Sequence, residues 1–431
     1  MERFALKELN AWKRSKRRKP LIIQGARQVG KTWLMKEFGK REYEQVAYVN
    51  FESSTVLKSL FKDDFDINRM ITAIQIETGI KINAENTLII FDEIQEAERG
   101  ITSLKYFNEN APQYHIIAAG SLLGITFHQK TSFPVGKVDF LNLFPMSFSE
   151  FLLAIGQRPL FELLESHDWP MITDFKTKLI DHLRHYYYIG GMPEAVYSFI
   201  NENDFDTVRT IQKNILAAYE HDFSKHAPKE IVPRIKMLWQ SIPAQLSKEN
   251  KKFIYGLVKQ GGRAKEFELA LAWLTDCGLV HKIHRISKPA IPLVSYMDLS
   301  AFKLYVLDVG LLSAMGDLTK QTLLMGNSIF NEFKGALTEQ FVLQHLKFRK
   351  DLQIFYWSSD TSVAELDFVI QWNGKVIPIE VKAEENLQAK SLKSFHQKFS
   401  PLSSIRTSMA DYRKEDWLTN VPLYAFDTFS F

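Results

Sequence analysis

Eight consecutive residues near the start of the chain have the types and spacing needed to hold phosphate groups. The segment GARQVGKT, which begins at Gly25, fits the pattern G-x-x-x-x-G-K-[ST] at every fixed position. In such a loop, backbone N–H groups point at the phosphates, and the N-terminus of the following helix attracts their negative charge. We expect Lys31 to reach the β- and γ-phosphates and Thr32 to bind Mg²⁺. The predicted nucleotide-binding residues are Gly25, Ala26, Arg27, Gln28, Val29, Gly30, Lys31 and Thr32.

A pair of acids, Asp92 and Glu93, could supply the second part of a site that hydrolyses a nucleotide. They close the segment TLIIFDE, whose apolar run is typical of a buried parallel strand. Ligands bind at the carboxyl ends of such strands, so we expect Asp92 to hold Mg²⁺ and Glu93 to act as general base on the attacking water. The alternative is a plain helix N-cap. Ser121, which follows the next apolar run, either senses the γ-phosphate or is a turn serine.

Five apolar runs alternate with helical patterns in the first third of the chain. This alternation predicts an α/β fold with a doubly wound parallel sheet. The phosphate-binding segment directly follows the first run, as a strand–loop–helix unit requires. The predicted strands are 21–24, 45–50, 88–92, 114–119 and 138–143.

Near the end of the chain, Asn373-Gly374 separates two β-rich segments and predicts a two-residue hairpin turn of type I′. Such a turn fixes which residues face each other across the hairpin. It places Asp367 opposite Glu380 and Glu365 opposite Lys382. Because side chains alternate with a period of two, all four would point to one face.

Two opposed carboxylates repel each other, so such a pair is tolerated when a cation lies between them. Mg²⁺ prefers oxygen ligands of this kind, which makes Asp367 and Glu380 a candidate metal site. Lys382 would then stabilise a pentavalent phosphate or help to activate water. The alternative is an inactive scaffold in which Glu365 and Lys382 form a surface ion pair.

The middle of the chain shows helical patterns over 161–235. The segment RAKEFELALAWLTDCGLVHKIHRI then predicts a helix followed by a strand, and PLVSYMDL predicts a second strand, which together make a winged-helix pattern. Modules of this type place a helix in a DNA groove or contact other proteins, and the sequence leaves both open. The basic residues around this segment are Lys248, Lys251, Lys252, Lys259, Arg263 and Lys265.

Several motifs, taken in order, resemble a known family. GARQVGKT, YVNFE, FDEIQ, AAGS, LFPMSFSEFL and YIGGMPEAV are similar to segments of the prokaryotic AAA-type P-loop ATPases that carry an uncharacterised C-terminal domain. The resemblance covers nearly the whole chain. It implies a P-loop ATPase core, a helical and winged-helix middle and a C-terminal α/β domain like the restriction-type nucleases. We expect these parts at 1–160, 161–235, 236–320 and 321–431.

The resemblance also implies residue roles. Restriction-type nucleases combine an acid on a preceding helix with a D…E-x-K centre, and four residues match these positions: Glu339, Asp367, Glu380 and Lys382. Together with Lys31 and Glu93 of the first site, they are the predicted catalytic residues. One position departs from the family pattern. Where an arginine is expected before the L-x-P-[LM]-S-F segment, this chain has Lys137, which lacks the bidentate fork of arginine, so no arginine finger is assigned.

Composition narrows the class of protein. The 431-residue chain is 45% hydrophobic and has a net charge of +4, too little to indicate nucleic-acid binding by itself. Its single cysteine, Cys277, excludes an intramolecular disulfide and indicates a reducing compartment. The N-terminal segment lacks the apolar core of a signal peptide, and no apolar run is long enough for a membrane span. The basic run at 13–19 is either a nuclear signal or DNA-binding arm, or a solvated helix end.

Together these features predict a cytoplasmic ATPase, with ATP and Mg²⁺ as cofactors, that switches a DNA-directed, nuclease-like C-terminal domain. One alternative is a nucleotide-gated switch whose target is a protein partner and whose nuclease fold is inactive. Another is an ATP-stimulated nuclease. A homo-oligomer stays open, because a finger arginine can come from a neighbouring subunit.

Overall fold

The computed structural model describes residues 1–54, 56–62, 64–120, 134–248, 251–324, 331–350, 352–359, 364–385 and 389–431. These residues form two compact units. The N-terminal unit comprises Glu2–Phe144 with Asp276–Gly278, and the C-terminal unit comprises Pro145–Thr275 and Leu279–Phe431. No helix within the described ranges is long and apolar enough to cross a membrane.

A five-stranded sheet with the strand order β2-β3-β4-β1-β5 forms the centre of the N-terminal unit. All of its neighbouring strands run parallel. The strands are β1 (Leu21–Gln24), β2 (Gln45–Asn50), β3 (Thr87–Asp92), β4 (His115–Ala119) and β5 (Asp139–Asn142). The helices are α1 (Ala5–Arg14), α2 (Lys31–Glu42), α3 (Ile67–Thr78) and α4 (Gly100–Asn110), with the short 3₁₀ turns η1 (Leu57–Ser59) and η2 (Ile94–Glu96). The five strands confirm those predicted, with each end within one residue.

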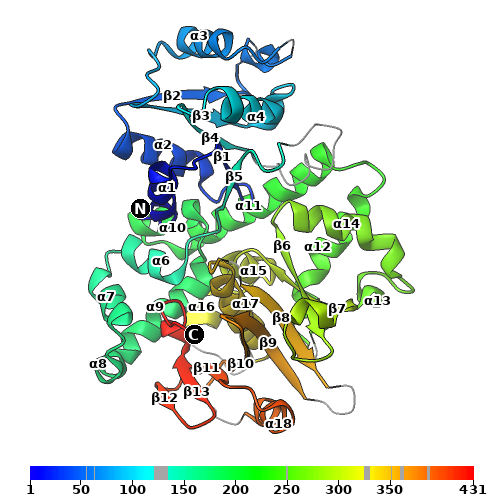
Figure 1. Ribbon diagram of the computed structural model, residues 1–431. Coiled ribbons are helices and arrows are strands. Elements are labelled where there is room, and N and C mark those ends of the chain that lie inside the picture. Colours follow the sequence, from blue (N-terminus) through cyan, green and yellow to red (C-terminus); the bar gives the residue numbers. More distant parts are fainter. Residues whose placement is uncertain are drawn as a thin grey trace. The chain divides into compact units, whose positions relative to one another are not determined.

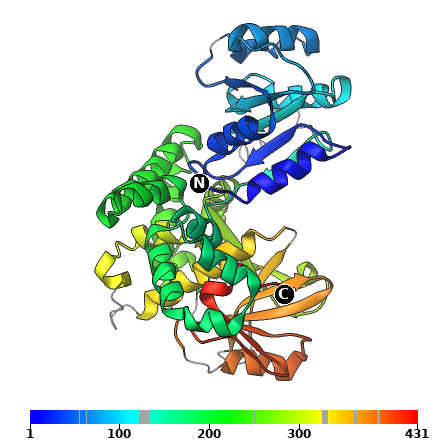
Figure 2. The same cartoon turned by 90° about the vertical axis from the view of Figure 1, so that its left-hand side faces the viewer.

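Helices cover both faces of this sheet, as the blue and cyan parts of Figures 1 and 2 show. On one face, Ile89 and Phe91 of β3 pack in a buried cluster with residues of α3 and α4. On the other, α2 lies so close that a Cβ on Gly39 would be 2.6 Å from Cγ2 of Val46. The N-terminal unit is therefore the predicted doubly wound α/β fold.

Helices make up the first half of the C-terminal unit and confirm the helical prediction for 161–235. They are α6 (Phe148–Ala154), α7 (Arg158–Ser166), α8 (Trp169–Asp174), α9 (Lys176–Ile189), α10 (Pro193–Glu202), α11 (Phe205–His226), α12 (Val232–Leu246), α13 (Tyr255–Val258) and α14 (Ala264–Asp276). Four more follow further along the chain: α15 (Val309–Met315), α16 (Lys320–Leu324), α17 (Asn331–Lys347) and α18 (Lys390–Phe399).

An eight-stranded mixed sheet forms the rest of the C-terminal unit, in the order β12-β13-β11-β10-β9-β8-β6-β7. Its strands are β6 (Val280–Ile286), β7 (Met297–Val306), β8 (Gln353–Ser358), β9 (Glu365–Trp372), β10 (Lys375–Val381), β11 (Ile405–Ser408), β12 (Arg413–Lys414) and β13 (Thr419–Pro422). The remaining elements are the 3₁₀ turns η3 (Leu293–Tyr296) and η5 (Leu423–Ala425).

The hairpin of β9 and β10 has the predicted turn and register. Asn373 and Gly374 have φ values of 46° and 73°, the positive angles that a type I′ turn requires. Five residue pairs follow the predicted register, from Trp372–Lys375 to Phe368–Ile379. The next pair would be Asp367 and Glu380, and there the side chains turn to other partners.

The helix α14 is followed by β6, as predicted, but the second strand begins later than predicted: Leu293–Tyr296 is the turn η3, and β7 (Met297–Val306) pairs antiparallel with β6. The far edge of β6 is not free, because Arg285 and Ile286 pair in parallel with Tyr356 and Trp357 of β8. The expected boundary between residues 320 and 321 thus separates strands of one continuous sheet. The winged-helix assignment and the four-part division stay predictions.

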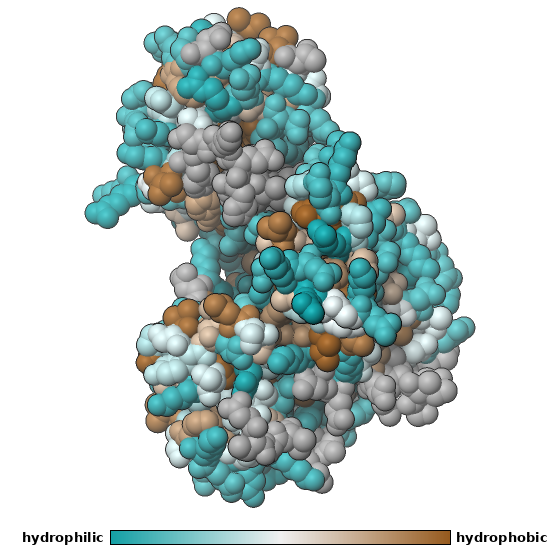
Figure 3. Space-filling model, turned by 90° about the vertical axis from the view of Figure 1, so that its right-hand side faces the viewer, coloured by the Kyte–Doolittle hydropathy of each residue, from teal (hydrophilic) through white to brown (hydrophobic). Residues whose placement is uncertain are grey.

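Exposed apolar side chains are scattered over the surface. On the face drawn in Figure 3, hydrophobic residues form separate spots among hydrophilic ones. The C-terminal unit exposes Ile254, Leu257 and Leu269 in the segment around α13 and α14. Single exposed apolar residues are normal on a folded surface, so they indicate no particular partner.

Candidate functional site

The segment between β1 and α2 adopts a tight loop that depends on its glycines. Gly25 has a φ of 149° and Gly30 a φ of 94°, and Gln28 is also left-handed at 67°. A Cβ on Gly25 would lie 2.2 Å from the carbonyl oxygen of Leu143, which is a clash. Both glycines of the motif are therefore needed for the backbone conformation, and Gly25 is needed for space as well.

Lys31 begins α2 and turns its side chain back into this loop. Its Nζ atom donates to the carbonyl oxygens of Gly25 and Ala26, each at 2.8 Å. Burial lowers the pKa of Lys31 to about 8, although the carboxylates of Glu93 and Asp92 act in the opposite direction. An ammonium group has three donors, so one N–H remains for a phosphate oxygen.

Asp92 ends β3, and its carboxylate joins three elements. Its Oδ2 atom accepts from the Thr32 hydroxyl at 2.7 Å and from the Tyr48 hydroxyl at 2.9 Å. Asp92 is only 3% exposed. The loop threonine and the strand acid that were predicted to bind Mg²⁺ thus lie together, as two oxygen groups of the kind that this ion prefers.

Glu93 lies directly after β3 in a left-handed conformation, with a φ of 50°. Its Oε2 atom accepts from the Gln95 side chain at 2.5 Å. A non-glycine residue in this region carries strain, which is common at functional sites. The left-handed turn directs Glu93 away from the strand direction, while Asp92 stays in the sheet beside Asn50 of β2.

Sequence reasoning missed two residues of this site. The hydroxyl of Tyr48 holds Asp92, and burial together with that carboxylate raises the pKa of Tyr48 to about 12. Arg3 is buried and donates to the carbonyl oxygens of Val29 at 3.0 Å and Phe144 at 2.6 Å. Because Val29 belongs to the loop, Arg3 links the loop to the end of the N-terminal unit. The parallel register could have indicated Tyr48, but no pattern in the sequence indicates Arg3.

Two residues considered for the nucleotide site from the sequence, Ser121 and Lys137, are not placed in it by the structure. Ser121 lies outside the described residues. Lys137, the residue at the expected arginine position, forms an ion pair with Glu109 at 2.9 Å. No arginine finger is assigned in the described part of the chain.

We expect ATP binding to take up a proton near pH 8. Before ATP binds, part of the Lys31 population is uncharged there, because its pKa is about 8. Adjacent phosphates favour the ammonium form and raise this pKa, so ATP affinity falls as the pH rises through this value. Calorimetry in buffers of different ionisation enthalpy measures the uptake. The Lys31→Arg variant, which stays charged, should show none of it, and equal uptake in that variant would contradict the assignment.

In the C-terminal unit, Glu339 of α17 lies in a buried ionic cluster. Lys251 forms an ion pair with its Oε1 atom. The Tyr305 hydroxyl donates to its Oε2 atom at 3.0 Å, and Lys303 lies 3.9 Å from the same atom. Burial alone would raise the pKa of Glu339, but Lys251 and Lys303 outweigh it and lower the pKa to about 2. Lys251 is therefore held inside and is not a surface residue for DNA.

Asp367 belongs to the same cluster, but its carboxyl group is protonated more readily than that of Glu339. Its Oδ2 atom accepts from the backbone N–H of Val381 at 2.7 Å. Burial and then the charge of Glu339 raise the pKa of Asp367 well above its usual range. A protonated Asp367 can donate to Glu339, which explains how two carboxyl groups lie together in the interior.

Lys303 of β7 supplies the central cation of this cluster. Its side chain is 1% exposed, and its Nζ atom lies 2.6 Å from Glu365. Burial acts against its charge, but Glu365, Glu339 and Asp367 outweigh it and raise the pKa of Lys303. With Asp367 protonated, the cations Lys251 and Lys303 balance the anions Glu339 and Glu365.

Glu380 and Lys382 lie in a different environment. They form an ion pair at 3.0 Å, and burial raises the pKa of Glu380. The Oε2 atom of Glu380 has no hydrogen-bond partner among the described residues. Glu365 and Glu380 do not have the predicted partners, because Glu365 contacts Lys303 and Glu380 contacts Lys382, whereas Glu339 and Asp367, which were expected in one site, do lie together. Within the described ranges, no three His, Cys, Asp or Glu residues are grouped so that they could hold a metal ion.

Three family models match separate parts of the chain. Residues 17–152 match an AAA domain. Residues 180–322 match a domain of unknown function, DUF8612, and residues 334–426 match another, DUF4143. No curated protein matches the chain closely enough to count as a relative.

Several solved structures are similar in fold. A Walker-type ATPase of Pyrococcus abyssi is 13% identical, with a TM-score of 0.46, over 72% of this chain and 94% of that one. The ORC1 protein of Aeropyrum pernix in complex with DNA is 11% identical, with a TM-score of 0.26, over 73% and 91%. Cdc6p of Pyrobaculum aerophilum is 12% identical, with a TM-score of 0.26, over 74% and 93%. All three TM-scores are below 0.5, so these likenesses support no statement about function.

The geometry of this loop and the family match both support a phosphate-binding loop at residues 25–32. A glycine-dependent loop follows the buried strand β1, its lysine begins a helix, and an acid at the end of β3 in the same sheet accepts from its threonine. The match over 17–152 covers all of these residues. Over residues 17–152, the N-terminal unit is similar to AAA domains and has the strand–loop–helix unit of a P-loop.

Proposed function

We propose that this protein binds ATP with Mg²⁺ and hydrolyses it at the loop of the N-terminal unit. The observation that carries this proposal is the 2.7 Å hydrogen bond between Thr32 and Asp92, which brings the two predicted Mg²⁺ ligands together. When bound, the ion supplies positive charge to the β- and γ-phosphates. The residues around it bind and orient the substrate.

Each residue of the site then has a separate task. The loop N–H groups bind the phosphates, and the remaining N–H of Lys31 donates to the γ-phosphate. Glu93 orients the attacking water and accepts its proton, while Gln95 fixes the carboxylate. Tyr48 keeps Asp92 directed toward the loop.

We further propose that the ATP cycle switches a DNA-directed activity of the C-terminal unit. Four of the six basic residues around α13 and α14 are exposed: Lys252, Lys259, Arg263 and Lys265. An exposed basic surface attracts DNA phosphates in a salt-dependent way.

The geometry favours binding of DNA over its cleavage. The acids Glu339 and Glu365 are already neutralised by Lys303 and Lys251, so a metal ion would have to displace an ammonium group. A metal-dependent nuclease is the second candidate. It is favoured by the buried, unpartnered Oε2 atom of Glu380 beside Lys382.

DNA assays with the full chain test both candidates. Single- and double-stranded DNA are titrated with the protein and Mg²⁺, with and without ATP. We expect salt-dependent binding whose affinity changes by about 5-fold or more with ATP, the usual size of allosteric coupling, and no cleavage products. Lys31→Ala should lose the ATP effect. Lys40→Ala, on the exposed side of the same helix, should keep it.

The other outcomes are equally informative. Cleavage that is lost in Lys382→Ala but kept in Lys375→Ala, at the exposed hairpin turn, would establish the nuclease. A DNA affinity that is the same with and without ATP would contradict the proposed switch. A protein that binds no DNA at all would leave the ATPase with a protein partner.

A further inference from the structure

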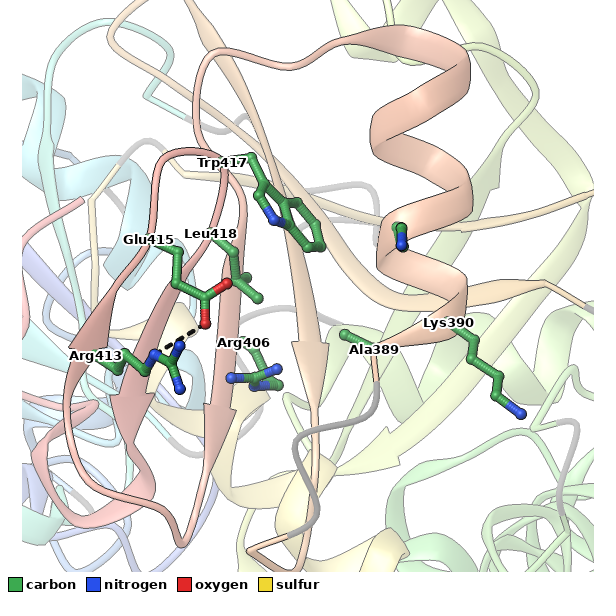
Figure 4. A pocket seen from close by; sticks show the side chains of 8 residues that line it. Ala389, Lys390, Arg406, Arg413, Glu415, Trp417 and Leu418 are labelled. Carbon is green, nitrogen blue, oxygen red and sulfur yellow. Dashed lines mark ion pairs between the residues drawn. The ribbon is translucent and has the colours of Figure 1, made fainter.

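A pocket of about 290 Å³ lies on the C-terminal unit between α18, β11 and the segment joining β12 to β13. Figure 4 shows it from close by. Four of its side chains are cations and one is an acid, so the lining has a net charge of +3. The lining side chains that matter here are Lys390, Lys393, Arg406, Arg413, Glu415 and Trp417.

Arg406 of β11 forms the fixed, inner part of this pocket. It is only 3% exposed, and its Nε atom donates to Oδ1 of Asn420 at 2.9 Å. Anchoring one nitrogen of the guanidinium sets the direction of the others, which is useful for recognising a planar or tetrahedral anion. In Figure 4 the group lies close to Ala389, where α18 begins.

The other charged side chains lie around this inner cation. Arg413 forms an ion pair with Glu415 at 3.1 Å and is otherwise exposed, with 65% of its side chain accessible. Lys393 is also exposed and lies one turn into α18. Lys390 extends away from the centre in Figure 4. The N-cap residue of α18, Ala389, supplies no side-chain cap, and the backbone N–H of Leu392 in the first turn bonds to the carboxylate of Glu380.

Trp417 gives the pocket an aromatic wall. Its ring lies 5.0 Å from that of His396 of α18, which holds the indole in place. In Figure 4 the indole faces α18 from the opposite side of the pocket. A cationic floor beside an aromatic wall matches a nucleotide, because a phosphate pairs with arginine and a base stacks on an indole.

We propose that this pocket binds one nucleotide unit, with its phosphate at Arg406, Arg413 and Lys393 and its base against Trp417. The chemistry is that of a nucleoside phosphate, either free or within a single strand. A purely acidic peptide would use the cations but not the indole. The proposal rests on the proposed DNA-directed function and gives it a contact site away from the helices α13 and α14.

The test uses the full chain with Lys31→Ala, so that the ATP site does not report nucleotide binding. The pocket variant is Arg413→Glu with Lys393→Glu. The matched control is Lys414→Glu with Lys398→Glu, which makes the same charge changes at exposed positions on the same elements but outside the pocket. Titrations use a labelled oligo-dT strand and, separately, dTMP, each at several salt concentrations.

We expect the pocket variant to weaken oligo-dT binding at least 10-fold and the control to change it less than 3-fold. Because one phosphate contact contributes about 0.7 to the salt slope for a single strand, the slope should fall by about 0.7 in the pocket variant alone. Trp417→Phe should weaken binding by a smaller factor without changing the slope, which separates stacking from charge.

The outcomes distinguish this pocket from the wider function. Oligo-dT binding that is equal in the pocket variant and the control overturns the pocket but leaves DNA binding intact. Binding of dTMP but not of oligo-dT, lost in the pocket variant, supports the pocket with a free nucleotide and overturns binding of single-stranded DNA there. No binding of either ligand overturns the pocket, and the double-stranded DNA titration then decides the DNA-directed function separately.

Discussion

Glu93→Gln lowers the rate of ATP hydrolysis by about 10²–10⁴-fold while ATP binding is kept, as is usual when a general base is removed. The amide has nearly the same shape as the carboxylate but cannot accept the proton of the attacking water. The phosphate contacts belong to the loop and to Lys31, so they stay in place. Phosphate release with Mg²⁺, together with a binding titration of a labelled ATP analogue, measures the two effects.

The matched control for this variant is Glu96→Gln. Glu96 lies three residues further on, in the exposed turn η2, and makes the same charge change outside the loop. Its hydrolysis rate should stay within about 3-fold of the parent chain, as is usual for an exposed residue that touches neither substrate nor water. If Glu93→Gln hydrolyses ATP at the parent rate, Glu93 is a structural residue and the base lies elsewhere.

Lys303→Met destabilises the C-terminal unit by about 3–5 kcal/mol, the usual cost of removing one partner from a buried ion pair. The variant leaves Glu365 and Glu339 buried with less positive charge nearby. Methionine keeps most of the volume, so the loss is mainly electrostatic. Denaturant unfolding, monitored by hydrogen exchange of backbone amides in β7 and β9, measures the loss of stability within this unit.

The second change in this experiment is Glu365→Gln. Added to Lys303→Met, it removes the anion left unpaired and should restore part of the lost stability, as a coupled pair requires. Lys375→Met at the exposed hairpin turn is the control and should cost less than about 0.5 kcal/mol. If Lys303→Met costs less than about 1 kcal/mol, the ammonium is not the group that balances the acids. In that case a metal site would again be the better explanation of the cluster.

The N-terminal unit could be predicted from the sequence because its signals are local. Each strand is an apolar run, and the loop between 25 and 32 has a fixed spacing. The contact of Thr32 with Asp92 follows from the parallel sheet, because Thr32 lies in the first turn of the helix after β1 and Asp92 ends β3 at the same edge. Arg3 could not be predicted, since its two carbonyl partners are far away in the chain.

The contacts within the buried ionic cluster of the C-terminal unit could not be predicted from sequence patterns. The hairpin register is right for five pairs, yet Asp367 and Glu380 do not form a sixth, and Asp367 accepts from the backbone N–H of Val381. The reason is a third partner: Lys303, on a strand distant in sequence, attracts the carboxyl groups of Glu365, Glu339 and Asp367. A lysine within the apolar run AFKLYV was the available signal, because a cation inside such a run must find buried anions.

The pairing of β6 with β8 makes two separately matched segments of the chain depend on each other. The segment 180–322 contributes β6 and β7, and the segment 334–426 contributes β8 and the strands beyond it. Either segment alone would present an unpaired edge strand, which invites aggregation or pairing with another chain. We therefore expect a chimera of two related chains to fold only when both segments come from the same parent, although two separate family models match them.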